Sequence, residues 1–206
     1  MKILSLSLIP LLIALVMAGG CSSNQPAEKP QPKPTEFQTG RTIFQQLYVA
    51  AHGWARDAQP IRLQSQVTPG DKDRDGKSAV WTGYFGSPSL RGVKFYTWSG
   101  TDAPDFSERG ISPGRMDTYN PSNTSTAIFD VRFLKVDSDQ AFAVAQKHGG
   151  EKVLQKNQDI PISYILDWNQ GANTLNWHVI YGPSRGDAKL VIDVDASTAA
   201  FVREEK

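Results

Sequence analysis

An acidic run between residues 71 and 76 is the first feature that could do chemistry. Asp71, Asp73 and Asp75 alternate with basic residues and are followed by Gly76. Oxygen ligands at alternate positions, closed by a glycine, form the first half of a twelve-residue calcium-binding loop. The twelfth position should hold a bidentate glutamate, and Thr82 stands there instead. The pattern therefore predicts a weak calcium site at the three aspartates, with a polar hairpin turn as the alternative.

Three histidines could bind a metal or transfer a proton: His52, His148 and His178. No two of them have the spacing of a zinc-binding pair, and the chain has no His-Glu-x-x-His motif. A Gly-x-Ser-x-Gly elbow and a phosphate-binding loop are also missing from the sequence. We therefore expect no catalytic residues and no cofactor other than calcium. A hydrolase with its site in residues 100–125 is the alternative.

Aromatic side chains could form a binding surface. The chain has five tryptophans, and most of them should lie in the core, because buried aromatics dominate small cores. We expect Trp81 and Trp177 to be core residues. Trp98, Tyr119 and Trp168 lie close to expected loops, and we expect them to line a surface that binds a peptide or a glycan.

The one cysteine, Cys21, lies directly behind an apolar stretch, residues 3–17. Lys2 precedes that stretch and the small residues 18–20 follow it, as in a secretory signal. The segment resembles a bacterial lipobox, although Ala18 stands where a branched apolar residue is usual. The resemblance implies cleavage before Cys21 and attachment of lipid to its sulfur. An ordinary signal peptide with one leftover thiol is the alternative.

The residues that follow Cys21 predict where the protein is located and how its folded part is attached. Ser22 rather than aspartate follows Cys21, so we expect the outer membrane, facing the periplasm. Residues 22–38 contain four prolines and predict an extended tether.

The charge balance of the processed chain limits its partners. Without Lys2, the 22 basic residues become 21, equal to the 21 acidic residues. This balance excludes a basic nucleic-acid footprint. The lipid anchor remains as the link to the membrane, and the body has no cysteine for a disulfide.

The rest of the chain predicts two helix-and-strand cycles, over residues 39–126 and 127–206. In the first, an apolar stripe predicts a helix over 39–57. Its three strands are expected at 61–67, 78–85 and 92–98, with an irregular segment at 100–125. Another strand is expected at 127–136, before the second helix.

In the second cycle, Asp137 with Gln140 predicts a capped helix that ends at Gly149-Gly150. Residues 151–156 add a further helical turn, and strands follow at 162–168, 175–181 and 189–195. In each cycle a proline, Pro60 or Pro161, separates the helix from three strands. The sequence thus predicts an α+β fold in which helices pack on an antiparallel sheet in two repeated units.

The second cycle resembles a PepSY domain. The family ends in a strand of the form V-x-V-D-A-x-T-G, and residues 190–199 have a similar sequence. Residues 176–181 resemble the preceding strand of the family. The resemblance covers residues 136–203 and extends more weakly over 41–100. It departs at Ala199, where glycine is usual and a turn with positive φ would be strained.

The resemblance implies two PepSY-like units and a role in binding rather than catalysis. Modules of this family restrain peptidases or bind partners in the cell envelope. We therefore expect a non-catalytic, lipid-anchored envelope protein whose partner is a peptidase or an extended peptide. An envelope hydrolase and a structural lipoprotein are the alternatives.

Overall fold

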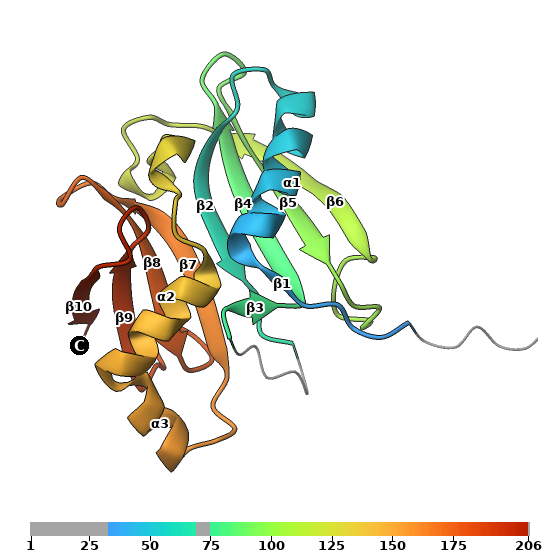
Figure 1. Cartoon of the computed structure of the whole chain (residues 1–206). Helices are drawn as coiled ribbons and strands as arrows, with labels where there is room; N and C mark the ends of the chain where they lie inside the picture. The colour runs from blue at the N-terminus through green and yellow to red at the C-terminus, as the bar shows by residue number, and fades with distance from the viewer. Residues whose placement is uncertain (1–32, 69–74, 206) are drawn as a thin grey trace, which may run out of the picture. The chain divides into compact units, whose positions relative to one another are not determined.

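The computed structural model describes residues 33–68 and 75–205, all within one compact unit, Pro32–Lys206. The fold is α+β. The described strands form an eight-stranded antiparallel sheet in the order β10-β9-β8-β7-β2-β4-β5-β6, and a two-stranded sheet, β1-β3 (Figure 1). Their bounds are β1 Gln38–Thr39, β2 Gln59–Ser65, β3 Lys77–Ser78, β4 Val80–Ser87, β5 Gly92–Ser99, β6 Gly110–Thr118, β7 Ile162–Asn169, β8 Thr174–Tyr181, β9 Leu190–Asp195 and β10 Phe201–Glu205.

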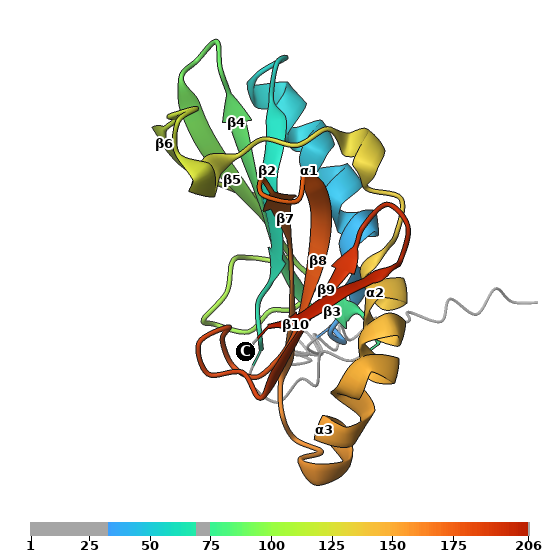
Figure 2. The same cartoon turned by 90° about the vertical axis from the view of Figure 1, so that its left-hand side faces the viewer.

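The helices lie on one face of the large sheet. α1 (Gly40–Trp54) packs on β2, β4 and β5, and α2 (Ser138–Ala145) packs on β8 and β9. A π-helical turn, Gln146–Gly150, leads from α2 into α3 (Glu151–Lys156). Figure 2 shows the sheet edge-on with α1 and α2 on the same side. We call the opposite side the open face.

The two halves of the large sheet have the same element order. α1 precedes β2, β4, β5 and β6, and α2 precedes β7, β8, β9 and β10. β2 and β7 pair antiparallel at the centre, where Leu63 is opposite Leu166. One continuous sheet therefore carries both halves.

Two buried tryptophans join the sheet to the helix starts. Trp81 on β4 and Trp177 on β8 are fully buried, and their rings meet edge to face with centroids 6.3 Å apart. Trp81 Nε1 donates to the carbonyl of Gln38, and Trp177 Nε1 donates to the carbonyl of Val136, both at 2.9 Å. Each acceptor directly precedes the N-cap residue of a helix. The expectation that both tryptophans are core residues is confirmed.

One carboxylate, that of Asp137, caps both helices. Its Oδ1 accepts from the backbone N–H of Ser138 at the start of α2 (2.7 Å) and from that of Arg41 in α1 (2.8 Å). Its Oδ2 accepts from the Thr39 hydroxyl at 2.8 Å, although Thr39 itself makes no side-chain cap on α1. The predicted capping box with Gln140 is present. The positive ends of both helix dipoles therefore meet one negative charge.

Gly40 is required by the close approach of α1 to the tryptophans. A Cβ at this position would lie 2.5 Å from the Trp177 ring and 3.0 Å from the Trp81 ring. Both indoles are fully buried and cannot move aside without opening the core.

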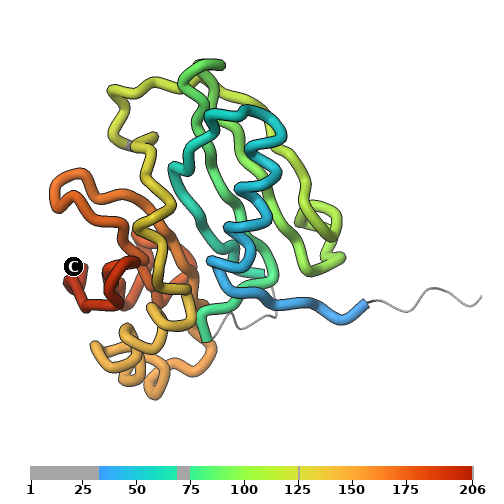
Figure 3. Tube along the Cα trace, turned by 45° about the horizontal axis from the view of Figure 1, so that its top comes forward, coloured from blue at the N-terminus to red at the C-terminus, as the bar shows by residue number. Residues whose placement is uncertain are grey.

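Two of the expected segments are wrong. Residues 127–136 form no strand; they carry a short 3₁₀ helix, Val131–Phe133, capped where Asp130 accepts from the backbone N–H of Arg132 (2.8 Å). That local bond gives the backbone an alternative to a strand ladder. Figure 3 shows this connection, in yellow, leading from the β6 side to α2. The segment 100–125 is not wholly irregular, because it contains β6.

Ala199 adopts a positive φ, at the position where the PepSY-like motif usually has glycine. Its φ is 62°, in the turn that joins β9 to β10. Its backbone N–H donates to the carbonyl of Asp195 at 2.9 Å, which closes the turn. The chain therefore keeps a glycine-like turn with an alanine in the left-handed region, at a steric cost.

We predict that Asp137→Ala lowers the free energy of unfolding by about 2 kcal/mol, because two helix caps are lost together. Urea denaturation of the full chain, followed by circular dichroism, measures the change. Asp139→Ala is the matched control, since Asp139 is an exposed acid in the first turn of α2 only. Equal losses in the two variants would contradict the shared cap.

Candidate functional site on the open face

Strand register gathers polar residues in two neighbouring rows on the open face. In one row, Arg62 on β2 is opposite Asp167 on β7, which is opposite Asn176 on β8. In the next row, His178 on β8 is opposite Asp193 on β9, which is opposite Arg203 on β10. Side chains alternate along a strand, so His178 points away from Trp177 and the helices.

His178 lies between two carboxylates. Its Nδ1 is hydrogen-bonded to Asp193 Oδ1, and its Nε2 lies 3.0 Å from Asp167 Oδ1. The residue is 3 % exposed and Asp193 is fully buried. Both ring nitrogens are therefore engaged inside the protein.

Guanidinium groups surround the same carboxylates. Arg203 donates from Nε to Asp193 Oδ2 (2.8 Å) and from Nη2 to Glu205 Oε1 (2.9 Å). Arg185, in the loop before β9, donates from Nε to Glu205 Oε2 at 2.7 Å. Arg62 Nη2 lies 3.0 Å from Asp167 Oδ2. We call the following residues the charge cluster: Arg62, Asp167, His178, Arg185, Asp193, Arg203 and Glu205.

The cluster favours a protonated histidine. Burial alone would lower the pKa of His178, but the hydrogen bonds and charges of Asp167 and Asp193 outweigh it and raise the pKa to about 8. Burial acts to raise the pKa of both aspartates, and their contacts with His178 overcome it and hold each pKa below the ordinary value. At neutral pH the cluster therefore contains four cations and three carboxylates.

This geometry restricts the chemistry of His178. A general base needs an imidazole nitrogen within reach of a substrate proton, and both nitrogens of His178 bind aspartates instead. His178, Asp193 and Glu205 do offer three ligand atoms within 4.8 Å of one another. However, Arg203 and Arg185 already donate to those carboxylates, and a metal ion would have to displace them. Both ring nitrogens of His178 and the carboxylates of Asp193 and Glu205 are thus already engaged within the protein.

A cavity of about 280 Å³ opens beside the cluster. Its lining combines a tryptophan, amides and the charged heads of the cluster: Thr124, Asp167, Trp168, Asn169, Gln170, His178, Arg185 and Arg203. Trp168, one of the aromatics expected at a binding surface, borders the cavity, but its ring packs on Phe133 with centroids 5.2 Å apart and against the core.

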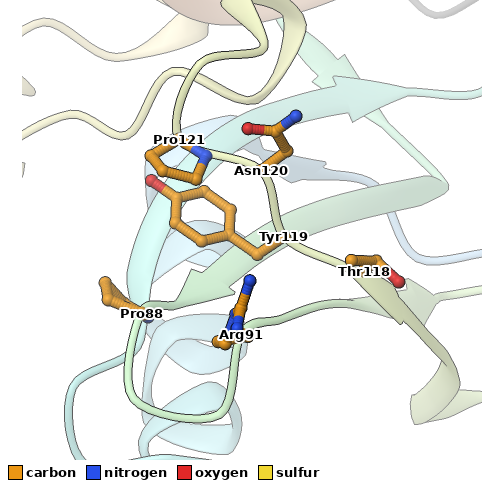
Figure 4. A pocket seen from close by; sticks show the side chains of 6 residues that line it. All are labelled: Pro88, Arg91, Thr118, Tyr119, Asn120 and Pro121. Carbon is orange, nitrogen blue, oxygen red and sulfur yellow. The ribbon is translucent and has the colours of Figure 1, made fainter.

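The other two predicted binding aromatics lie elsewhere. Trp98 is 6 % exposed and belongs to the core, so it does not line a surface. Tyr119 lines a cavity of about 550 Å³ with Pro88, Arg91 and Pro121, shown in Figure 4. The structure therefore does not bring the three aromatics together into one site.

The predicted lipid and calcium residues are mostly outside the described part of the chain. Cys21, Asp71 and Asp73 lie outside it. Asp75 is described and has a φ of 61° in the turn before β3. The next residue, Gly76, donates its N–H to the Tyr164 hydroxyl at 3.1 Å, so this end of the turn is attached to β7.

The three histidines do not share a site. His52 packs on Tyr48 with ring centroids 4.3 Å apart, and His148 stacks on Phe201 at 4.0 Å. Sequence reasoning missed the charged partners of His178. A usable signal existed in β9, where Asp193 interrupts the apolar residues 190–194.

A second surface lies at the sheet edge formed by β6. Among the strands in the described part of the chain, this nine-residue strand pairs only with β5, and Ile111 and Met116 are 40 % and 61 % exposed. A cavity of about 560 Å³ adjoins it, with Met116, Tyr84 and Phe95 in its lining. The rings of Tyr84 and Phe95 lie 5.8 Å apart. The edge therefore combines a strand lacking a second partner with an aromatic surface.

Comparison with known proteins finds no matching family model, no matching curated protein and no matching solved structure. Within the described ranges, none of the helices has the length and apolar character needed to cross a membrane.

We predict that His178 makes the protein more stable in mild acid than in mild base. Its folded pKa of about 8 exceeds the unfolded value of 6.5, so its contribution is fully present below pH 6.5 and is lost as the pH rises through 8. The shift corresponds to about 2 kcal/mol. Urea denaturation at pH 6 and pH 9 measures the difference.

The matched variants are His178→Gln and His52→Gln. The fall in unfolding free energy between the two pH values should shrink in the first and persist in the second, whatever the absolute stabilities. The groups that face His178 are Asp167, Arg185, Asp193 and Glu205, and the hydrogen bonds and charges of Asp167 and Asp193 raise its pKa. The same fall in both variants would contradict the assignment.

Proposed function

We propose that this protein is a lipid-anchored component of the cell envelope that binds an extended peptide, such as a segment of an envelope peptidase. The lipobox-like segment at Cys21 supports an anchor, and the proline-rich residues 22–38 support a tether between lipid and folded body. The outer membrane, facing the periplasm, is the proposed location.

We further propose that the two halves of the large sheet are PepSY-like units. Equivalent features in both halves support this: a helix before an antiparallel meander, and an indole that donates to the carbonyl preceding the helix N-cap. In that family the fold serves binding, which agrees with a non-catalytic role. The engagement of both His178 ring nitrogens by aspartates also favours binding over hydrolysis.

The observation that carries the peptide-binding proposal is the exposed edge at β6. An edge strand presents free N–H and C=O groups on which an extended peptide can add as a new strand. Side chains of the added strand would alternate, and every second one would lie over the face that carries Tyr84 and Phe95. Backbone pairing would supply affinity and the aromatic cavity would supply selectivity for an apolar side chain.

Strand addition predicts where a partner contacts the protein. A photo-crosslinking amino acid at position 116 of the full chain, in intact cells, should attach to an extended segment of an envelope protein. The same amino acid at Val49, which is 74 % exposed on α1, is the matched control. Mass spectrometry identifies the crosslinked segment, which is then synthesised as a peptide.

The affinity of that synthetic peptide decides the proposal. Met116→Lys should weaken its binding to the full-length protein at least tenfold, because a charged edge opposes strand addition. Val49→Lys should leave the affinity unchanged. Equal crosslinking from positions 49 and 116, or equal affinity of the two lysine variants, would show that the edge of β6 is not the binding site.

The anchor is tested separately. Metabolic labelling with a tritiated fatty acid should label the protein, and Cys21→Ser should remove the label and move the protein from the membrane fraction to the soluble fraction. Lipid with several acyl chains holds a protein firmly, whereas one chain binds reversibly. Label that persists in Cys21→Ser would refute the anchor and leave the edge of β6 unaffected.

A further inference from the structure

We propose that the cavity of about 550 Å³ around Tyr119 binds a small aromatic carboxylate. The cavity lies where β6 ends, at Thr118, beside the turn that joins β4 to β5. It does not depend on peptide binding at the β6 edge. Three observations carry the proposal: an arginine without a partner, backbone strain at that arginine, and walls made of rigid rings.

Arg91 supplies the positive charge of the cavity. It is the one charged residue among the six that line it. Arg91 is exposed, and its guanidinium makes no hydrogen bond and no ion pair with any residue in the described part of the chain. Asp57, the acid bonded to the same turn, is already engaged, because it accepts from the Ser87 hydroxyl (2.7 Å) and the Ser89 backbone N–H (2.8 Å). A planar guanidinium is therefore available to a ligand.

The backbone of Arg91 is strained. Its φ is 47°, in the left-handed region that glycine adopts at no steric cost. Its N–H donates to the carbonyl of Pro88 (3.2 Å), and its carbonyl accepts from the N–H of Tyr119 (2.9 Å), so the conformation is fixed from both sides. Strain of this kind clusters at ligand sites. The arginine therefore points to a function of its side chain that a glycine would lose.

The walls of the cavity are rigid rings. Tyr119 is 8 % exposed, and a Cβ on Gly86 would lie 3.2 Å from its ring, so the ring rests against the backbone of β4. Pro88 and Pro121 stand around the same ring (Figure 4). Rigid side chains give contact area with little loss of rotamer entropy, and aromatic groups pack well on a tyrosine ring. The walls therefore favour a flat apolar group.

The charge and the volume complete the description of the ligand. The two oxygens of a carboxylate match the guanidinium fork, and one negative charge balances the single charge of Arg91. A dianion such as a phosphate ester would place a second charge against the apolar rings. The volume of about 550 Å³ lies within the range of about 300–1,000 Å³ that is usual for small-molecule sites, which combine apolar walls with a few polar groups.

Two sources could supply an aromatic carboxylate: a free aromatic acid, or the C-terminal end of a peptide whose last residue is aromatic. Isothermal titration calorimetry of the full chain at pH 7 uses 3-phenylpropanoate for the first source and N-acetylphenylalanine for the second. The controls are 3-phenylpropanamide, which has the ring without the charge, and propanoate, which has the charge without the ring. At least one aromatic carboxylate should give saturable binding at least tenfold tighter than both controls.

Arg91→Gly locates the charge. It should weaken binding of the preferred carboxylate at least tenfold while the thermal midpoint stays the same or rises, because glycine relieves the positive φ. Lys156→Gln removes an exposed positive charge from the last turn of α3. It is the matched control and should leave the affinity unchanged.

Asn120→Asp is a second test that keeps the arginine in place. Asn120 Oδ1 accepts from the Ser122 N–H at 3.0 Å, a bond that an aspartate can also accept. The added carboxylate would compete for Arg91 and repel the ligand, so binding should again weaken at least tenfold.

Three results would overturn the proposal. These are no saturable heat with either aromatic carboxylate, binding of either control that equals theirs, and binding that survives both Arg91→Gly and Asn120→Asp. Tighter binding of 3-phenylpropanoate would assign the site to a free acid, tighter binding of N-acetylphenylalanine would assign it to a peptide end, and either supports the aromatic carboxylate. Crosslinking from position 116 tests the β6 edge separately, so the two proposals can fail independently.

Discussion

The meeting of two helix N-termini above the central strands is the constraint on which the rest of the structure depends. The positive ends of α1 and α2 would repel each other, and the carboxylate of Asp137 removes that repulsion by accepting hydrogen bonds from both helices. Trp81 and Trp177 fix the position of each helix start relative to the sheet, because each indole donates to the carbonyl that precedes a helix N-cap. β2 and β7 can then pair directly beneath them, and two half-sheets become one.

This arrangement explains why a charge cluster can exist on the open face. The apolar sides of both helices pack on the face opposite the open face. The core therefore does not require apolar residues at Asp167, His178 or Asp193, which lie on the open face. Burying such charges is nevertheless unfavourable unless every one of them is paired, and β10 completes the pairing with Arg203 and Glu205. A paired buried network of this kind adds little stability over apolar packing.

Local signals in the sequence predicted much of the fold. The stripe of Phe44, Leu47 and Ala51 identified α1, and all three residues are buried. β6 escaped notice because Pro113 is a strand breaker except at an edge, and edge position depends on the whole sheet. The contacts of His178 were unpredictable for a similar reason. Arg62 and Asp167, for example, are 105 residues apart, and only the β2–β7 register brings them together.

The distance between the β6 edge and the charge cluster has a mechanical consequence. From β6 the sheet runs through β5, β4, β2 and β7 to His178 on β8, five strand spacings, or about 24 Å. No side chain spans that distance, so a strand added at β6 could not touch the charge cluster. The edge and the cluster are connected only through the central β2–β7 pair, which the helix N-termini above it hold in one register.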